Sequence, residues 1–270
     1  MRASSQAHAS QTATAAARAA AFAILVGVRV AVVSDIHANL HALEAVLADV
    51  AGAPIDEVWC LGDIVGYGPK PNECCALVRE HAGVVLCGNH DLAVTGGLDL
   101  AEFSGEAARA ARWTQEVLES GNRDWLASLS PVAARDRAEL FHASPRDPVW
   151  DYVLSEQVAL QSLRLTEAPV VLVGHSHVAL ALSTGGGGDI AGGLAPGGTE
   201  VALAGRRWLL NPGSVGQPRD SDPHAAWLLL DFDADRATFR RVAYDVEATQ
   251  AEIRAAGLPD ALAARLALGL

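Results

Sequence analysis

Cysteine is scarce in this sequence of 270 residues, and methionine and aromatic side chains are few as well. The four cysteines form neither a C-x-x-C pair nor the spacing of a secreted disulfide scaffold; they are Cys60, Cys74, Cys75 and Cys87. The sequence therefore predicts no disulfide framework, and a reducing, cytoplasmic location fits it best.

Basic residues are also in short supply. Lysine and arginine together number 20 against 32 aspartates and glutamates, and the formal net charge is −12. This balance argues against non-specific nucleic-acid binding, which needs a basic face. It leaves a nucleotide substrate open, because bound divalent cations would reverse the charge at the site itself. Half of the residues are hydrophobic, which is enough to bury a full core.

No apolar run is long enough to cross a membrane. The longest, over residues 19–33, has about 15 residues where a span needs roughly 20. A signal peptide is not expected either, since this run continues directly into the strand that ends at Asp35. The Ala, Ser, Thr and Gln of residues 1–21 offer little to bury. We therefore predict that residues 1–27 are a disordered or helical leader or an artefact of gene annotation, and that residues 28–270 form a single domain.

Short apolar runs alternate with helical periodicity through the first two thirds of the chain, and strands then follow one another directly. Strands are expected from residue 30 to Asp35 and over residues 57–61, 84–87, 139–141, 169–173, 178–182, 207–210, 226–232 and 237–244. Helices are expected over residues 40–52, 71–81, 155–165, twice within 99–130 and twice within 246–270, and residues 184–198 are predicted to be a mobile glycine-rich loop. This order predicts a layered α/β sandwich.

Five of the predicted strands end in side chains that can bind a metal. In chain order these are Asp35 and His37, Asp63, Asn89 and His90, His142, and His175 and His177. Oxygen and imidazole ligands without cysteine suit Mn, Fe, Zn, Co or Ni. Even seven of these eight residues as ligands are too many for one ion, and seven fit two ions that share a carboxylate. Two ions about 3.5–4 Å apart can hold both the attacking and the leaving oxygen of a phosphoryl transfer. Glycines 62, 88 and 174 precede ligands and are predicted to let the backbone turn sharply.

The series D-x-H at 35–37, G-D at 62–63, G-N-H-D at 88–91, H at 142 and G-H-x-H at 174–177 resembles the calcineurin-like metallophosphoesterase superfamily. The segments D-I-H-A-N-L, G-D-I-V-G-Y-G-P-K-P-N-E, H-A-S-P and N-P-G-S-V-G-Q-P-R-D are similar to its compact bacterial phosphodiesterase branch. The match runs from residue 30 to about residue 222. The resemblance implies a four-layer α/β/β/α sandwich in which mixed sheets are flanked by helices.

The resemblance also implies a role for each ligand-type residue. One ion would be held by Asp35, His37 and His177, the second by Asn89, His142 and His175, and Asp63 would bridge them. His90 would contact the phosphate and protonate the leaving oxygen, and Asp91 would orient and charge its ring. The two divalent ions are expected to be Mn, with Fe, Zn, Ni or Co as alternatives.

The function predicted from these motifs is hydrolysis of a small or nucleotide-type phosphodiester by attack of a hydroxide that bridges the two metals. A phosphomonoesterase, a protein Ser/Thr phosphatase, a dinucleoside tetraphosphatase and a non-catalytic scaffold on the same fold are the alternatives. The scaffold is disfavoured because every ligand position is filled, and the protein phosphatase because residues 64–69 contain no arginine to grip the phosphate. The oligomeric state is left open, a homo-oligomer included.

Three residues are candidates for substrate binding, and each has a structural alternative. Asn39 could instead cap a helix, and Tyr67 could be a packed loop aromatic. Arg219 could bind a phosphate oxygen or could pair with Asp220 or Asp222. Among the other histidines, His41 is interpreted as a packed or exposed helix residue, His81 as a capping or helix-dipole residue near a helix C-terminus, and His224 as a surface residue.

Overall fold

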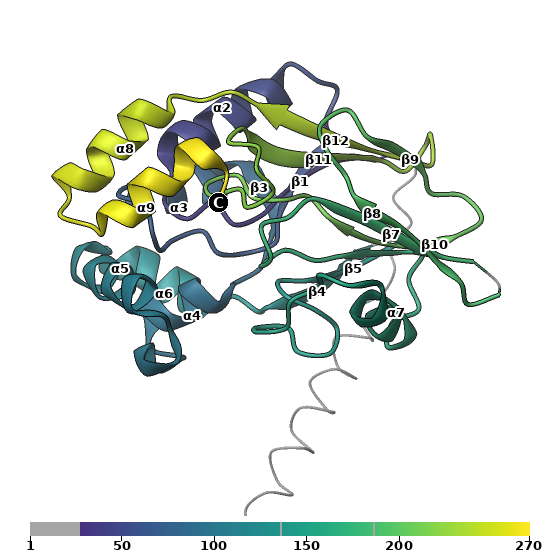
Figure 1. Cartoon of the computed structure of the whole chain (residues 1–270), viewed down its shortest axis with the longest axis horizontal. Coiled ribbons are helices and arrows are strands. Elements are labelled where there is room, and N and C mark those ends of the chain that lie inside the picture. The colour runs from purple at the N-terminus through teal and green to yellow at the C-terminus, as the bar shows by residue number, and fades with distance from the viewer. Residues whose placement is uncertain (1–27, 136, 186) are drawn as a thin grey trace, which may run out of the picture.

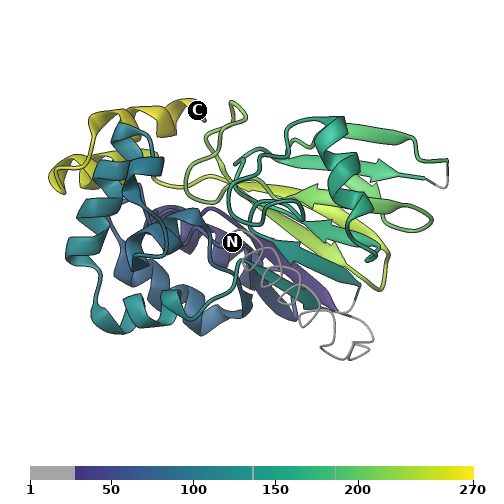
Figure 2. The same cartoon turned by 90° about the horizontal axis from the view of Figure 1, so that it is seen from below.

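Two six-stranded mixed sheets face each other across the centre of the molecule, in a computed structural model that describes residues 28–270 except 136 and 186 (Figures 1 and 2). The first sheet has the order β3 (Ala82–Val85), β2 (Glu57–Cys60), β1 (Arg29–Val33), β11 (Ala225–Asp231), β12 (Arg236–Val242) and β9 (Glu200–Ala202). The second has the order β4 (Val132–Arg135), β5 (Ala138–Phe141), β6 (Val170–Leu172), β10 (Arg207–Asn211), β7 (Leu180–Thr184) and β8 (Ile190–Leu194).

The parallel strands of each sheet lie side by side. β1, β2 and β3 run parallel in the first sheet, and β5, β6 and β10 run parallel in the second. The remaining pairings are antiparallel. Because the carboxyl ends of parallel strands share one edge, the residues that follow β1, β2, β3, β5 and β6 are brought together.

Helices cover the outer faces of both sheets, which confirms the predicted α/β/β/α order (Figure 1). They are α2 (Leu40–Ala51), α3 (Pro71–His81), α4 (Asn89–Thr95), α5 (Gly105–Val117), α6 (Ser120–Ala127), α7 (Glu156–Arg164), α8 (Val246–Ala255) and α9 (Asp260–Ala264), with the 3-10 turns η1 (Leu100–Glu102) and η2 (Arg265–Leu268). α7 packs on the second sheet, and α2 and α3 pack on the first. None of the helices in the described residues is long and apolar enough to cross a membrane.

The alternation of side chains along β1 explains why its sequence is a continuous apolar run. Val30 and Val32 point into the core between the sheets, whereas Ala31 and Val33 pack beneath the helices on the other face. A strand buried on both sides must be apolar at every position. The polar side chains therefore begin only where the strand ends.

Four strands and helices were not expected from the sequence. Part of the glycine-rich segment predicted to be a mobile loop is β8, and β4, β9 and the short helix α4 were not predicted. In β8, Gly192 has a φ of +122°, and a Cβ there would lie 1.9 Å from the carbonyl oxygen of Ala181 on β7. Glycine at this position lets β7 and β8 approach each other closely. The high glycine content of the segment alone does not predict such a contact. The predictions for residues 1–27 fall outside the described residues, and the single domain stays a prediction.

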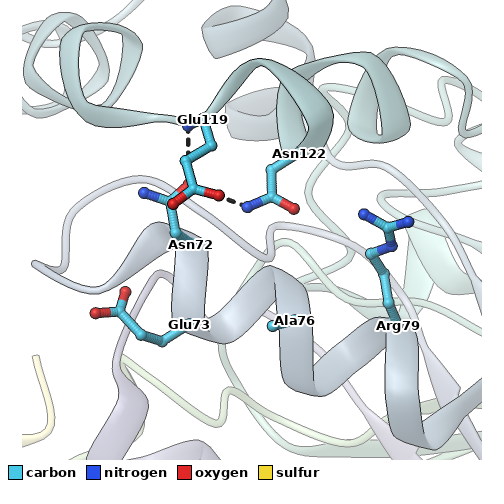
Figure 3. Close-up of a pocket in the computed structure, with 6 residues that line it drawn as sticks. All are labelled: Asn72, Glu73, Ala76, Arg79, Glu119 and Asn122. Atoms are coloured by element: carbon cyan, nitrogen blue, oxygen red, sulfur yellow. Dashed lines mark hydrogen bonds between the residues drawn. The ribbon is translucent and has the colours of Figure 1, made fainter.

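A polar hollow lies between α3 and the start of α6 on the helical side of the molecule (Figure 3). The Asn72 side-chain amide donates to the carbonyl of Val117 at 2.9 Å and accepts from the amide N–H of Glu119 at 2.9 Å. The Asn122 side-chain nitrogen lies 3.0 Å from the same Asn72 oxygen. These hydrogen bonds hold α3 against the start of α6. None of the predicted metal ligands lines the hollow.

Candidate metal centre

The seven predicted metal ligands lie together at the carboxyl edge of the two sheets, and all of them are buried. Two groups have their ligand atoms within 4.8 Å of one another. The first consists of Asp35, His37, Asp63 and His177, and the second of Asp63, His142 and His175. Asn89 adjoins the second group, since its Oδ1 lies 3.2 Å from His142 Nε2. Asp63 is common to both groups, in the position that the resemblance implies for a bridging residue.

A single oxygen of Asp63 lies between the two groups. Asp63 Oδ2 is 3.6 Å from Nε2 of His37 and also 3.6 Å from Nε2 of His142. Its other oxygen, Oδ1, accepts the backbone N–H of His90 at 2.9 Å. One oxygen is therefore fixed by the backbone at the start of α4, and the other faces both groups.

Backbone carbonyls determine which ring nitrogen carries the proton in three of the histidines. Nδ1 of His37 lies 3.2 Å from the carbonyl of Val65, and Nδ1 of His142 lies 2.9 Å from that of Leu61. His177 Nδ1 lies 2.6 Å from the carbonyl of Gln217. A carbonyl can only accept, so the proton of each neutral ring is on Nδ1. The lone pair of each Nε2 then points into the cluster, as a metal ligand requires.

Several atoms in this cluster have no satisfactory partner within the protein. Nε2 of His37 lies 3.0 Å from Nε2 of His177, which brings two lone pairs face to face. Among the described residues, Asp35 Oδ1, Asp63 Oδ2 and His175 Nε2 are buried without a hydrogen-bond partner. Buried polar atoms are normally paired, and an unpaired one costs about 1–3 kcal/mol. A cation at each group would satisfy all of these atoms, so the residues fit divalent metal ions.

The pKa shifts of the carboxyl groups and imidazole rings in the cluster also favour a bound cation. Burial raises the pKa of Asp35 to about 7, and the nearby Asp63 adds to the shift. Burial and the neighbouring Asp91 raise the pKa of Asp63 well above its ordinary value. Burial lowers the pKa of His175 to about 2 and holds the pKa of His37 and His177 far below the usual range. His37, His175 and His177 are thus neutral and can each offer a lone pair, and a cation bound between the residues would favour the ionised form of both carboxyl groups.

Five of the seven predicted ligands have an unusual backbone conformation. Asp35, His37, Asp63, His175 and His177 all have φ values between 50° and 61°. The left-handed region is uncommon for residues other than glycine, and such residues often occur at functional sites. The expectation that the preceding glycines supply the sharp turns is correct only for Gly62, whose φ is +98°. Gly88 and Gly174 are needed for space: a Cβ would lie 2.0 Å from Asp63 Oδ1 and 2.1 Å from Ser34 Oγ, respectively.

Asp91 has a different role from the predicted one of orienting the His90 ring. Its carboxylate accepts the backbone N–H groups of Ile64 at 3.0 Å, Val65 at 3.1 Å and Gly88 at 2.9 Å. These donors belong to the loop after β2 and to the segment that enters α4. Asp91 therefore fixes the backbone around Asp63 and does not touch the His90 ring.

The His90 ring is enclosed by other rings at the centre. Its centroid lies 4.4 Å from that of Tyr67, 4.9 Å from that of His37 and 5.2 Å from that of Phe103. A Cβ on Gly66 would be 2.6 Å from His90 Nδ1, so that side of the ring is closed by backbone. Burial lowers the pKa of His90 to about 3, and the guanidinium of Arg219 contributes to the shift.

The three predicted substrate-binding residues lie beside the first group. The Asn39 side chain accepts from the N–H of Ala42 as a helix cap and donates to the carbonyl of Gly216 at 2.9 Å, so it is engaged within the protein. Tyr67 packs against His37 and His90. The pairing of Arg219 with Asp220 or Asp222, considered from the sequence, is not formed; both carboxylates pair with Arg241.

Sequence reasoning missed an aromatic rim beside the second group. The ring of Tyr152 lies 4.2 Å from His175, and that of Trp150 lies 6.5 Å from it and 5.1 Å from Phe103. Tyr152 is 46% exposed, an unusual state for a large ring. The two aromatic residues Trp150 and Tyr152, shortly after His142 in the sequence, are the pattern from which this rim could have been predicted. Among the other histidines, His81 is exposed at the end of α3, His224 is exposed and His41 is partly exposed, as expected.

Comparisons with known proteins agree with this geometry. A model of the calcineurin-like phosphoesterase superfamily domain matches residues 28–235. An uncharacterised protein of Methanocaldococcus jannaschii is 36% identical over 246 residues, which are 89% of this chain and 98% of that protein. The crystal structure of a metallophosphoesterase from Sphaerobacter thermophilus is 40% identical and superposes with a TM-score of 0.81, covering 91% of this chain and 100% of that one.

A further similarity covers about half of each chain. The symmetrical bis(5'-nucleosyl)-tetraphosphatase of Vibrio cholerae is 29% identical over 145 residues, which are 51% of this chain and 52% of that protein.

Replacing Asp91 by alanine should destabilise the protein, because three buried N–H groups would lose their acceptor. We expect Asp91→Ala to lower the free energy of unfolding by about 3 kcal/mol and Asp91→Asn to lower it by less, since an amide oxygen still accepts. Urea denaturation followed by tryptophan fluorescence measures both. The exposed Asp124→Ala is the matched control, and equal stability of Asp91→Ala and this control would remove the structural role of Asp91.

Metal binding should release a proton. In the metal-free protein the Asp35 carboxyl has a pKa of about 7 and is therefore largely protonated at pH 6, whereas a ligand must be ionised. We expect the affinity for Mn²⁺ to rise with pH through about 7 and then to level off, with a smaller proton release in Asp35→Asn. Calorimetric titrations in two buffers of different ionisation enthalpy report the proton, and identical enthalpies at pH 6 would contradict the prediction.

Proposed function

We propose that this chain, which belongs to the calcineurin-like phosphoesterase superfamily, is a dinuclear metal-dependent phosphodiesterase acting on a small or nucleotide-type phosphodiester. The observation that carries the proposal is the placement of one unpaired Asp63 oxygen between two groups of inward-facing histidines. A carboxylate shared between two ligand sets is the arrangement that a two-metal phosphoesterase needs.

In this proposal Asp35, His37 and His177 hold one ion, Asn89, His142 and His175 hold the second, and Asp63 is shared. We expect Mn²⁺, with Fe, Zn, Ni or Co as alternatives, because oxygen and imidazole donors without thiolate suit these ions. Bound there, the two ions would supply an acidified water as nucleophile and positive charge opposite the phosphate. The protein's own part is to position the phosphate and to protonate the leaving oxygen.

His90 is the proposed acid. Its Nδ1 faces the backbone of Gly66, so we assign the proton transfer to Nε2. Burial keeps the free ring neutral, with a pKa of about 3. An anionic phosphate beside the ring would favour its charged form and raise that pKa, so that the ring gains its proton when the substrate binds.

The aromatic rim supports a substrate with an aryl group or a nucleobase. Tyr152 and Trp150 stand beside His175, and Tyr152 keeps an exposed face. Stacking of a base on an aromatic side chain contributes about 1–3 kcal/mol. This rim favours a nucleotide-type diester over a small alkyl ester.

Hydrolysis of a dinucleoside tetraphosphate is the second candidate. It is favoured by the half-length similarity to a symmetrical bis(5'-nucleosyl)-tetraphosphatase. The loop at residues 64–69 contains no arginine to bind the phosphate, which favours a phosphodiester substrate instead. Phosphomonoester and phosphoprotein substrates rank lower, and the filled ligand set disfavours a non-catalytic scaffold. The four free, buried cysteines support a reducing cytoplasm, and the negative net charge supports small substrates over non-specific nucleic-acid binding.

Replacement of His90 by asparagine should impair chemistry and leave metal binding intact. Because general acid catalysis is lost, we expect kcat to fall about a hundredfold to ten-thousandfold. Turnover and metal content are measured on the same sample. His224→Asn is the control, since His224 is exposed and away from the motifs. Undiminished turnover by His90→Asn would remove His90 from the mechanism.

A substrate panel tests the reaction class. With Mn²⁺ added, we expect a higher kcat/KM for bis(p-nitrophenyl) phosphate than for p-nitrophenyl phosphate or a phosphoserine peptide. Diadenosine tetraphosphate is included, and its preferential cleavage would select the second candidate. Asp63→Asn, which lacks the shared carboxylate, should be inactive on every substrate and so reports contaminating phosphatases. Activity on the phosphopeptide alone would overturn the proposal.

A further inference from the structure

Two arginines at the edge of the metal centre share one neutral acceptor. Arg219 donates from a terminal guanidinium nitrogen to Oε1 of Gln217 at 2.9 Å, and Arg265 donates to the same oxygen at 3.3 Å. Within the described part of the chain, neither guanidinium forms an ion pair with a carboxylate. Two like charges thus lie side by side without an ion pair, although Asp35 and Asp63 lie close enough to Arg219 to interact with it electrostatically.

The arrangement is electrostatically unfavourable for the protein alone. Arg219 Nε is buried and has no hydrogen-bond partner among the described residues. Burial and the neighbouring Arg219 lower the pKa of Arg265. Glu106 partly offsets this effect but makes no ion pair with Arg265, and the nearby Asp220 and Asp222 are engaged by Arg241. Both side chains are half-buried. Two guanidinium groups that repel each other without an ion pair are costly, so an anion between them would lower that cost.

The pair adjoins the site of chemistry. Arg219 donates its backbone N–H to the carbonyl of His177 at 3.1 Å, and its guanidinium lies 5.8 Å from the centroid of the Tyr67 ring, which packs on His90. Arg265 comes from η2, beyond the residues 28–235 matched by the family model. A small hollow is lined by His37, Tyr67, Gln217 and Leu266, among others, so η2 lies next to the first ligand group, although neither arginine lines this hollow.

We propose that Arg219 and Arg265 together bind a second phosphate group of the substrate, in addition to the phosphate that reacts at the metal centre. This inference rests on the proposed function and narrows its substrate class to molecules that carry another phosphoryl group beside the reacting one. A dianionic phosphate matches the double positive charge better than a carboxylate does, and its three oxygens can accept from both planar guanidinium groups.

The first test measures anion binding without catalysis. Inorganic phosphate is titrated by calorimetry into metal-free protein, and acetate is titrated in parallel. We expect the wild type to bind phosphate in preference to acetate and Arg265→Gln to weaken phosphate binding about tenfold, with partial recovery in Arg265→Lys. Arg254→Gln on the neighbouring α8 is the matched control, because Arg254 is engaged with Asp260 at the surface.

The second test locates this phosphate relative to the reacting one. AMP and ADP are compared as competitive inhibitors of diester hydrolysis. We expect ADP to inhibit the wild type about tenfold more tightly than AMP and this preference to disappear in Arg265→Gln. If the substitution weakens both nucleotides equally, the arginines hold the reacting phosphate and the inference is overturned.

The two tests separate the inference from the proposed function. Absence of phosphate binding in the wild type, or equal binding by wild type and Arg265→Gln, would overturn the arginine site whatever the enzyme hydrolyses. Phosphate binding that depends on Arg265 in a protein with no phosphoesterase activity would support the anion site and reject the proposed function.

Discussion

The Asp63 carboxylate is the constraint around which this edge of the molecule is built. One oxygen is fixed by the N–H of His90, and the other is left between two sets of histidine nitrogens. Holding a buried carboxylate in this way requires room and rigid surroundings. The missing Cβ of Gly88 provides the room, and the three hydrogen bonds to Asp91 provide the rigidity. Because Asp91 and Asp63 are both buried acids, each raises the free energy of ionising the other, and a cation beside Asp63 would offset this cost.

The pairing of the two sheets turns this local arrangement into a centre with two halves. The first sheet supplies Asp35, His37, Asp63 and Asn89 from the ends of its parallel strands, and the second supplies His142, His175 and His177. Neither sheet alone has enough ligands for two ions. Each ligand group contains residues from both sheets, so the packing of apolar side chains between the sheets fixes the distances within each group. Five of the ligand residues follow their strands in left-handed backbone conformations.

The sequence predicted what depends on local order and failed where distant segments meet. β1, β2, β5 and β6 end where a buried apolar run gives way to a polar residue, so their positions, the fold class and the clustering of ligand-type residues could be predicted. The role of Asp91 could not, because its partners lie 26 and 27 residues away at Val65 and Ile64. The glycines at 88 and 174 looked like turn residues, but their requirement is space beside side chains of other strands. The partner of Asp220, Arg241, is likewise 21 residues distant on β12.

In the proposed function, the chemistry and the specificity come from different parts of the chain. The ligands follow strands of the shared fold, whereas the groups that surround them come from connecting segments: Phe103 after η1, Trp150 and Tyr152 in the loop before α7, and Arg265 from η2. The aromatic rings stand beside His175 of one half-site, and Arg219 is joined to His177 of the other. A substrate in contact with both would place an aromatic base at one end and a second phosphate at the other, with the reacting phosphorus between them at Asp63. Such a site would distinguish substrates by the charge and stacking of their ends, while the proposed two-metal chemistry at its centre would be indifferent to both.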